Sequence, residues 1–163
     1  MTYSVNKFFL NKTVDAPSRQ TISTTYEEIN GSKCEVSRNV SNNFIYKFNF
    51  CLATIYMFGT GGSYDKMLLH VKLQKSNDNF SSNIVDIEGC QFNISGDTTE
   101  NRDYHYHTCT PTFILENLDS NYLRLVARSY STSNEAHLHR SYNYDGVIGN
   151  EIYFNTSLLV MEI

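Results

Sequence analysis

Two pairs of histidines, each separated by one residue, are the groups in this 163-residue chain whose spacing suits metal binding. They are His105 with His107, and His137 with His139. Side chains two residues apart on a β-strand project to the same side, so each pair could offer two imidazoles to one metal ion. Cys109 extends the first pair in the same direction. The other interpretation, which we favour, is that these are ordinary strand or loop residues.

An enzyme built on such a pair would need further residues around it. Jelly-roll metal enzymes of the cupin type also use a His-x-His pair, with a glycine six residues before it and a glutamate four or five residues after it. Here the first pair has Thr99 and Pro111-Thr112 at those positions, and the second has Ser131 and Asn143-Tyr144. A metal-dependent jelly-roll enzyme is therefore only our third hypothesis for the function.

A tyrosine-rich segment near the end of the chain is the second candidate site. It consists of Tyr142, Asn143, Tyr144 and Asp145. Tyrosine rings can stack on a sugar while amide and carboxylate groups hydrogen-bond to its hydroxyls. The segment predicts a carbohydrate-binding module as the second hypothesis, and an ordinary long loop is the alternative.

Nucleophilic catalysis has no support in the sequence. The chain contains no G-x-S-x-G motif, and its glycine-rich turn, residues 59–63, lacks the lysine and the helix of a phosphate-binding loop. We therefore expect a protein that is not an enzyme and needs no cofactor.

The elements that must position these candidates are β-strands. In Phe44–Leu52, the even-numbered residues form an aromatic and apolar face and the others a mixed one, which is the alternation of a half-buried strand. The same period recurs in 66–74 and 122–130, whereas 151–163 is apolar on both faces and is expected in the middle of a sheet. Weaker strands are predicted at 21–29, 33–40, 83–94 and 105–118. Polar turns separate these runs and no helical period is present, so the sequence predicts an all-β sandwich or barrel with little or no helix.

Length and composition fit one domain. The chain is 40% hydrophobic and 13% aromatic, which suffices for a packed core. Residues 1–20 have poor periodicity and are expected to be an N-terminal arm or linker, followed by the sandwich domain at 21–163. The four cysteines include no C-x-x-C pair, and we expect free, mostly buried thiols.

Charge and hydropathy exclude two classes of partner. The net charge is −4, the pI is about 5.7, and the 13 Lys and Arg residues are scattered singly, so no nucleic acid is expected to bind. No stretch approaches the roughly 18 apolar residues of a membrane span, so we expect no membrane insertion.

Three segments resemble the trimeric jelly roll shared by tumour necrosis factor and the globular heads of complement-type collagenous proteins. They are Tyr26–Ser32 before a short strand, the long aromatic strand Phe44–Tyr56, and the closing Tyr153–Leu159. The last is similar to the terminal strand of the family, where Phe-x-Gly-x-Leu-Leu is usual, although Thr156 stands at the glycine position and the chain has no Trp. Similar jelly-roll modules occur among virion proteins of large DNA viruses.

The resemblance implies an antiparallel jelly-roll β-sandwich that assembles as a homotrimer. In that family an aromatic sheet face packs around the threefold axis, which would employ part of the 12 Tyr and 10 Phe of this chain. Tyrosines that simply reach solvent at sheet edges are the alternative. Our leading hypothesis is a non-enzymatic oligomeric structural or attachment domain, such as a receptor-binding head or a viral capsid or fibre component. Its expected location is a virion or extracellular surface, and its expected partner is a host receptor, a glycan or another structural protein.

Overall fold

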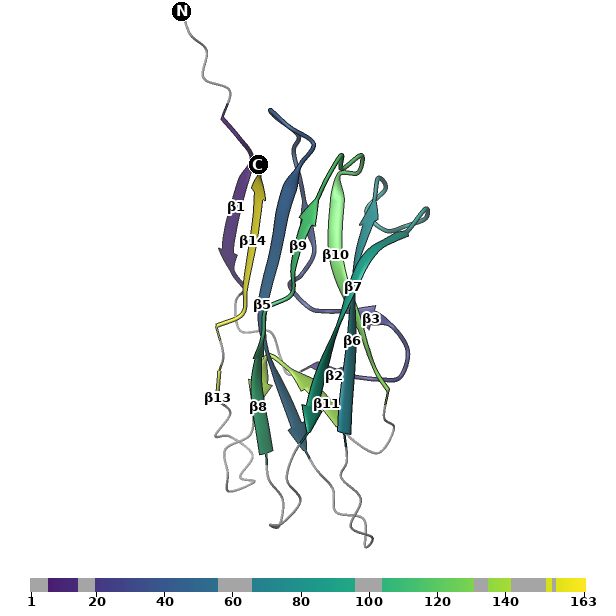
Figure 1. Ribbon diagram of the computed structural model, residues 1–163, viewed down its shortest axis with the longest axis vertical. Helices are drawn as coiled ribbons and strands as arrows, with labels where there is room; N and C mark the ends of the chain where they lie inside the picture. The colour runs from purple at the N-terminus through teal and green to yellow at the C-terminus, as the bar shows by residue number, and fades with distance from the viewer. Residues whose placement is uncertain are drawn as a thin grey trace, which may run out of the picture.

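A computed structural model of the chain (Figure 1) describes residues 6–14, 20–55, 66–95, 104–130, 135–141, 152–153 and 155–163. Residues 53–55, 66–67, 94–95, 104–106, 135, 140–141 and 152–153 are described by their backbone alone. Every regular element in these ranges is a strand, and the strands form two antiparallel sheets that pack as a β-sandwich. The predicted all-β fold class is confirmed.

The first sheet is organised around one long central strand, β5 (Phe44–Ile55). Its first half lies between β14 (Ser157–Glu162) and β9 (Thr112–Leu115), and its second half between β11 (Glu135–Leu138) and β8 (Tyr104–Cys109). The edge strand β1 (Phe9–Thr13) pairs with β14, and β2 (Gln20–Ile22) pairs with β11. The predicted central position of the last strand is thus confirmed for β14, which has a neighbour on each side.

The second sheet has the order β3, β10, β6, β7. These strands are β3 (Glu27–Glu28), β10 (Tyr122–Ser129), β6 (Lys66–Ser76) and β7 (Val85–Ser95), and the short β4 (Cys34–Glu35) also pairs with β10. A separate ribbon is formed by β12 (Arg140–Ser141) and β13 (Ile152–Tyr153). None of the described elements is a helix with the length and apolarity needed to cross a membrane.

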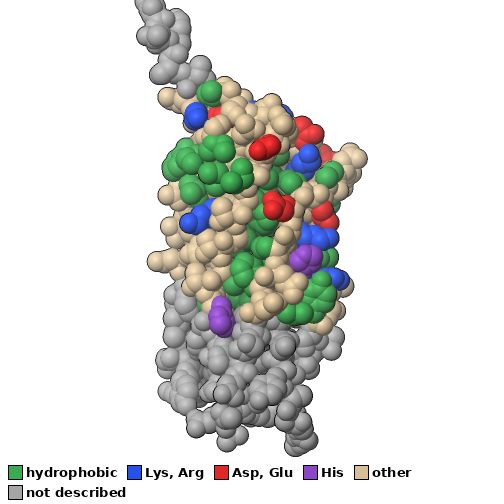
Figure 2. Space-filling view, viewed as in Figure 1, with side chains coloured by type: hydrophobic (Ala, Val, Ile, Leu, Met, Phe, Trp, Pro, Cys, Tyr) green, Lys and Arg blue, Asp and Glu red, His purple; other side chains and the backbone are tan. Residues whose placement is uncertain are grey.

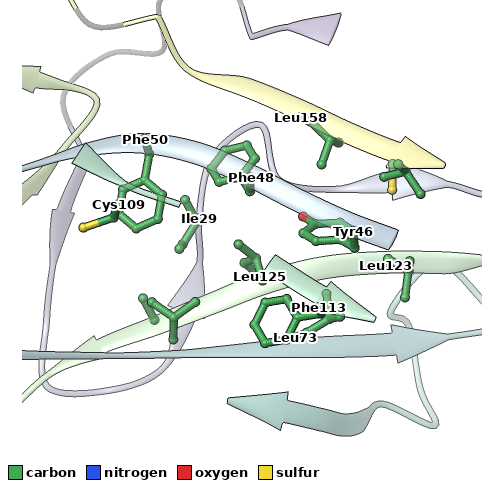
Figure 3. Packing of buried hydrophobic residues seen from close by; sticks show 14 of the residues in the cluster. Ile29, Tyr46, Phe48, Phe50, Leu73, Cys109, Phe113, Leu123, Leu125 and Leu158 are labelled. Atoms are coloured by element: carbon green, nitrogen blue, oxygen red, sulfur yellow. The ribbon is translucent and has the colours of Figure 1, made fainter. Parts of the chain in front are cut away.

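The core is the layer of side chains between the two sheets. Every second residue of a strand points into this layer. Between residues 44 and 52 of β5, all five even-numbered side chains are at most 1% exposed; they are Phe44, Tyr46, Phe48, Phe50 and Leu52. They pack against leucines of the second sheet such as Leu73, Leu123 and Leu125 (Figure 3). The buried Tyr46 hydroxyl has a hydrogen-bond partner in this layer, because it donates to the Ser32 carbonyl.

The first sheet begins earlier in the chain than residue 21. Strand β1 lies inside the segment expected to be an arm, and its five residues pair with β14 from Phe9 opposite Met161 to Thr13 opposite Ser157. Its period is hidden in the sequence because Phe8, Phe9 and Leu10 are consecutive apolar residues. An edge strand with an apolar residue on its outer side does not show the alternation of a half-buried strand.

A buried carboxylate forms hydrogen bonds with several backbone segments at one end of the first sheet. Glu162, 1% exposed, accepts hydrogen bonds from the backbone N–H groups of Phe8 (2.8 Å), Val40 (2.6 Å) and Ser41. Desolvation alone would raise the pKa of this carboxyl, but the backbone hydrogen bonds prevail and hold its pKa below the ordinary value. Glu162 therefore joins β14, the approach to β1 and the loop before β5.

Candidate binding surfaces

The four residues of the predicted carbohydrate-binding loop, Tyr142, Asn143, Tyr144 and Asp145, lie outside the described residues. That hypothesis remains a prediction.

The first histidine pair lies on β8 and the first histidine of the second pair lies on β11, with β5 between them. His107 is opposite Leu52, and His137 is opposite the next residue of β5, Ala53. Because neighbouring residues of a strand face opposite sides, the backbone register places His107 and His137 on opposite faces of the sheet. The His107 side chain is exposed, and the side chain of His105 is not among those described.

The second pair does not follow the alternation that the sequence suggested. His139 has a φ of 72°, just beyond the end of β11, and this left-handed conformation interrupts the strand. Its ring packs edge-on against the core rings of Phe48 and Phe50, with both centroids 6.4 Å away. Its Nδ1 lies 3.1 Å from Thr156 Oγ1, whereas His137 Nδ1 lies 3.1 Å from Thr21 Oγ1. The two imidazoles therefore have separate environments.

Burial determines the charge of His139. Desolvation lowers its pKa from 6.5 to about 4, so the ring is neutral at neutral pH. A neutral imidazole can bind a metal, but within the described part of the chain no three His, Cys, Asp or Glu residues are grouped to hold one. The metal site at His105, His107, His137 and His139 remains a prediction, and the described residues do not provide a complete set of ligands for it.

The four cysteines are free thiols, as predicted, and three of them are buried. Burial raises the pKa of Cys34, Cys51 and Cys109 to about 12 each. Almost none of these thiols is a thiolate at neutral pH, so they are poor nucleophiles and poor metal ligands.

The outer face of the first sheet carries a continuous line of apolar side chains. Phe9 of β1 is opposite Met161 of β14, which is opposite Ile45 of β5, which is opposite Ile114 of β9. We call these four residues the apolar row. Phe9 is 61% exposed and Ile114 is 64% exposed, while the two central residues are half-buried. Figure 2 shows hydrophobic side chains gathered on the surface over the upper parts of β1, β14 and β5.

The outer face of the second sheet carries a group of cationic and aromatic side chains. It comprises Tyr26, His70, Lys72, Arg128 and Tyr130, which we call the cationic-aromatic cluster. The register places His70 of β6 opposite Arg128 of β10. The centroid of the Tyr26 ring lies 4.4 Å from Lys72 Nζ and 4.9 Å from Arg128 Cζ. Each such contact stabilises the position of a cation over a ring.

A polar hollow of about 360 Å³ lies at one end of the sandwich. Its lining consists of Arg38, Asn39, Val40, Ser41, Asn42, Asn43 and Asn117. The Arg38 guanidinium already donates hydrogen bonds to the Leu118 carbonyl and to Asn121 Oδ1 (2.8 Å), and the described residues that line the hollow include no aromatic ring. It lacks the apolar surface that ligand pockets ordinarily provide.

No protein-family model matches the chain, and a search of curated proteins returns no match.

Sequence reasoning missed both surfaces. In the sequence, Phe9 was assigned to the arm, Ile45 to the mixed side of a strand, and Ile114 and Met161 to two other predicted strands. The cluster draws on residues from three distant segments. The available signal was that Ile45 and Ile114 are apolar although the residues on either side of each of them already supply the core.

Proposed function

We propose that the protein is a non-enzymatic, self-associating β-sandwich that serves as a structural or attachment domain. The observation that carries the proposal is the apolar row. Single exposed apolar residues are ordinary on a protein surface, but four directly opposite residues on four adjacent strands form one continuous strip. A second copy of the chain offers the same strip and can cover it.

The energetic argument concerns the two most exposed members of the row. Transfer of a large apolar side chain from water to a packed interface contributes about 1.5–3 kcal/mol. Phe9 and Ile114 each leave more than half of that contribution unused in the isolated chain. Association that buries both rows would recover it.

Strand order supports a jelly roll as the fold of this domain. Each sheet has four principal strands when β1 and β2 are counted as one strand, and likewise β3 and β4, β8 and β9, and β11 and β14. One sheet then contains the first, last, third and sixth strands along the chain, and the other contains the second, seventh, fourth and fifth. Chain segments that alternate between sheets in this way are expected of a jelly roll. The resemblance to tumour necrosis factor-type heads favours three copies, and a place on a virion or another extracellular surface rests on that resemblance.

Sedimentation velocity at micromolar concentrations tests the assembly, with Ile114→Lys as the disrupting variant. Ile114 points outward, so the substitution places a charge in the apolar row without disturbing the core. Val85→Lys is the matched control, because Val85 is 47% exposed on β7 of the other sheet.

We expect a trimer for the unmodified chain and for Val85→Lys, and a monomer for Ile114→Lys. Circular dichroism should show the same strand content in all three proteins. A monomeric unmodified chain, or an Ile114→Lys variant that keeps its mass, would refute the proposal.

A further inference from the structure

Arg128, at the centre of the cationic-aromatic cluster, is a positioned cation with no counter-charge among the described residues. Its guanidinium Cζ lies 4.5 Å from the centroid of Tyr130 and 4.9 Å from that of Tyr26, and its Nη2 donates a 2.9 Å hydrogen bond to Tyr130 Oη. The described part of the chain supplies no carboxylate to it and no acceptor for its buried Nε. Two rings thus orient a charge that none of the described carboxylates neutralises.

Two other cations on this face differ because each has a carboxylate partner. Arg124, also on β10, forms an ion pair with Glu28 at 3.1 Å. Lys72 forms one with Asp86 at 2.7 Å, and Gln74 occupies the second oxygen of that carboxylate at 2.8 Å. Asp86 is therefore engaged and does not compensate Arg128.

His70 lies among the cations of the cluster. Its Nδ1 is hydrogen-bonded to the Tyr26 hydroxyl, and its ring lies 6.2 Å from that of Tyr130. Burial, together with the positive charges of Lys72 and Arg128, lowers the pKa of His70 below its ordinary value, although Asp86 acts in the opposite direction. The cluster is thus locally positive on a protein whose net charge is −4.

A glycine of β7, Gly89, lies beside His70 on this surface. Gly89 of β7 is opposite Lys72, and a Cβ at that position would lie 3.1 Å from His70 Nε2 and 3.2 Å from the Val71 carbonyl. A side chain there would push against the imidazole. The absence of a side chain at Gly89 therefore lets the His70 imidazole lie close to the β7 backbone.

We propose that the cationic-aromatic cluster binds an acidic sugar, whose carboxylate pairs with Arg128 and whose ring contacts Tyr130. The planar guanidinium fork matches a carboxylate in geometry and charge. Tyr130 is 49% exposed, and an exposed tyrosine offers both an apolar face and a hydroxyl to a pyranose. One uncompensated cation suits a single acidic group and not a polyanion, which needs an extended basic surface.

This site goes beyond the proposed self-association and is independent of it. The apolar row lies on the outer face of the first sheet, and the cluster lies on the outer face of the second. Both surfaces are therefore available at once, and an attachment domain could assemble through one and bind a glycan through the other.

The test is an NMR titration with D-glucuronate that follows the ring signals of His70 and Tyr130. Glucose supplies the sugar without the charge, and acetate supplies the carboxylate without the ring. We expect glucuronate to bind with a Kd on the order of 1 mM and each partial probe to bind at least about tenfold more weakly.

Arg128→Gln should weaken glucuronate binding about tenfold or more, because it removes the charge and keeps a side chain of similar length. Arg124→Gln is the matched control on the same strand and should leave the affinity within about twofold. Tyr130→Ala should weaken it severalfold, and none of the three variants should change the sedimentation behaviour.

Glucuronate affinity that survives Arg128→Gln would overturn the proposal, as would equal binding of glucose or of acetate. Loss of assembly in Ile114→Lys with glucuronate binding retained would separate this site from the proposed function. A titration that shows no shift of the His70 or Tyr130 signals at saturating glucuronate would also refute it.

Discussion

The outer faces of the two sheets leave different chemical groups in contact with water. On the first sheet, Phe9 and Ile114 are more than half exposed, and the residues between them are also apolar. On the second sheet, cations lie over aromatic rings, and two of them have carboxylate partners. Binding at the first face is favoured by removal of apolar side chains from water, and binding at the second face is favoured by the pairing of opposite charges. The same strand geometry therefore supports two kinds of recognition.

The largest expected effect is a difference in stability between substitutions on the inner side of β5 and on the outer side of its neighbour β9. Phe48→Ala should lower the free energy of unfolding by about 3–5 kcal/mol, because it empties a fully buried site on β5. Ile114→Ala on the neighbouring β9 should change it by less than about 0.5 kcal/mol. Urea unfolding at concentrations where the protein is monomeric measures both. Similar losses in the two variants would mean that Ile114 stabilises the fold and is not kept for association.

Acid should destabilise the first sheet through His139. Its pKa is about 4 in the folded protein and 6.5 in the unfolded chain, so the unfolded state binds more protons between these values. Stability is therefore retained above pH 6.5 and falls as the pH decreases toward 4, by on the order of 3 kcal/mol in total. Thermal unfolding across this range measures the loss.

His139→Asn should reduce this acid sensitivity, because asparagine tolerates the left-handed backbone at this position and has no proton to bind. Equal profiles for His139→Asn and the unmodified protein would exclude His139 as the source.

Salt should act in opposite directions on the two faces. Raising the ionic strength from about 0.05 M to about 0.5 M shortens the screening length and should weaken glucuronate binding roughly threefold to tenfold. Self-association through the apolar row should be unchanged or slightly stronger. Parallel titrations and sedimentation runs test the pair, and a salt-sensitive assembly would show that charges hold it together.

The smallest effect concerns the paired charges of the second sheet. Glu28→Gln should cost no more than about 1 kcal/mol of stability, because the ion pair with Arg124 is partly exposed to solvent. Glu35→Gln, on the exposed side of β4, is the control and should be close to neutral. Chemical unfolding resolves the difference, and a larger loss in Glu28→Gln would mean that this pair is structural.

Two-residue alternation was sufficient to predict the core because burial in a sandwich follows the side of the strand. Phe44, Tyr46 and Phe48 could be assigned to the core from their spacing alone, and so could Leu123 and Leu125 of the second sheet. The central place of the last strand followed from its apolar residues on both sides.

Register and local conformation could not be predicted in the same way. The apolar row exists only because four strands pair at one level, which depends on hydrogen bonds between segments far apart in the chain. His139 leaves the strand pattern through a single backbone angle, and its spacing from His137 gives no sign of this. The joining of Tyr26, His70 and Arg128 likewise depends on the order of β3, β10 and β6.

The clamp at Glu162 has a mechanical consequence. Phe9 is opposite Met161, so the two ends of the described chain leave the sandwich side by side (Figure 1). A force that pulled these two ends apart would break the hydrogen-bonded pairs between β1 and β14 one after another, starting at Phe9 and Met161. It would not load all the pairs at the same time. The hydrogen bond from the Phe8 N–H to Glu162 is at the start of that ladder and would carry the load first, while Val40 and Ser41 hold the same carboxylate to the loop before β5.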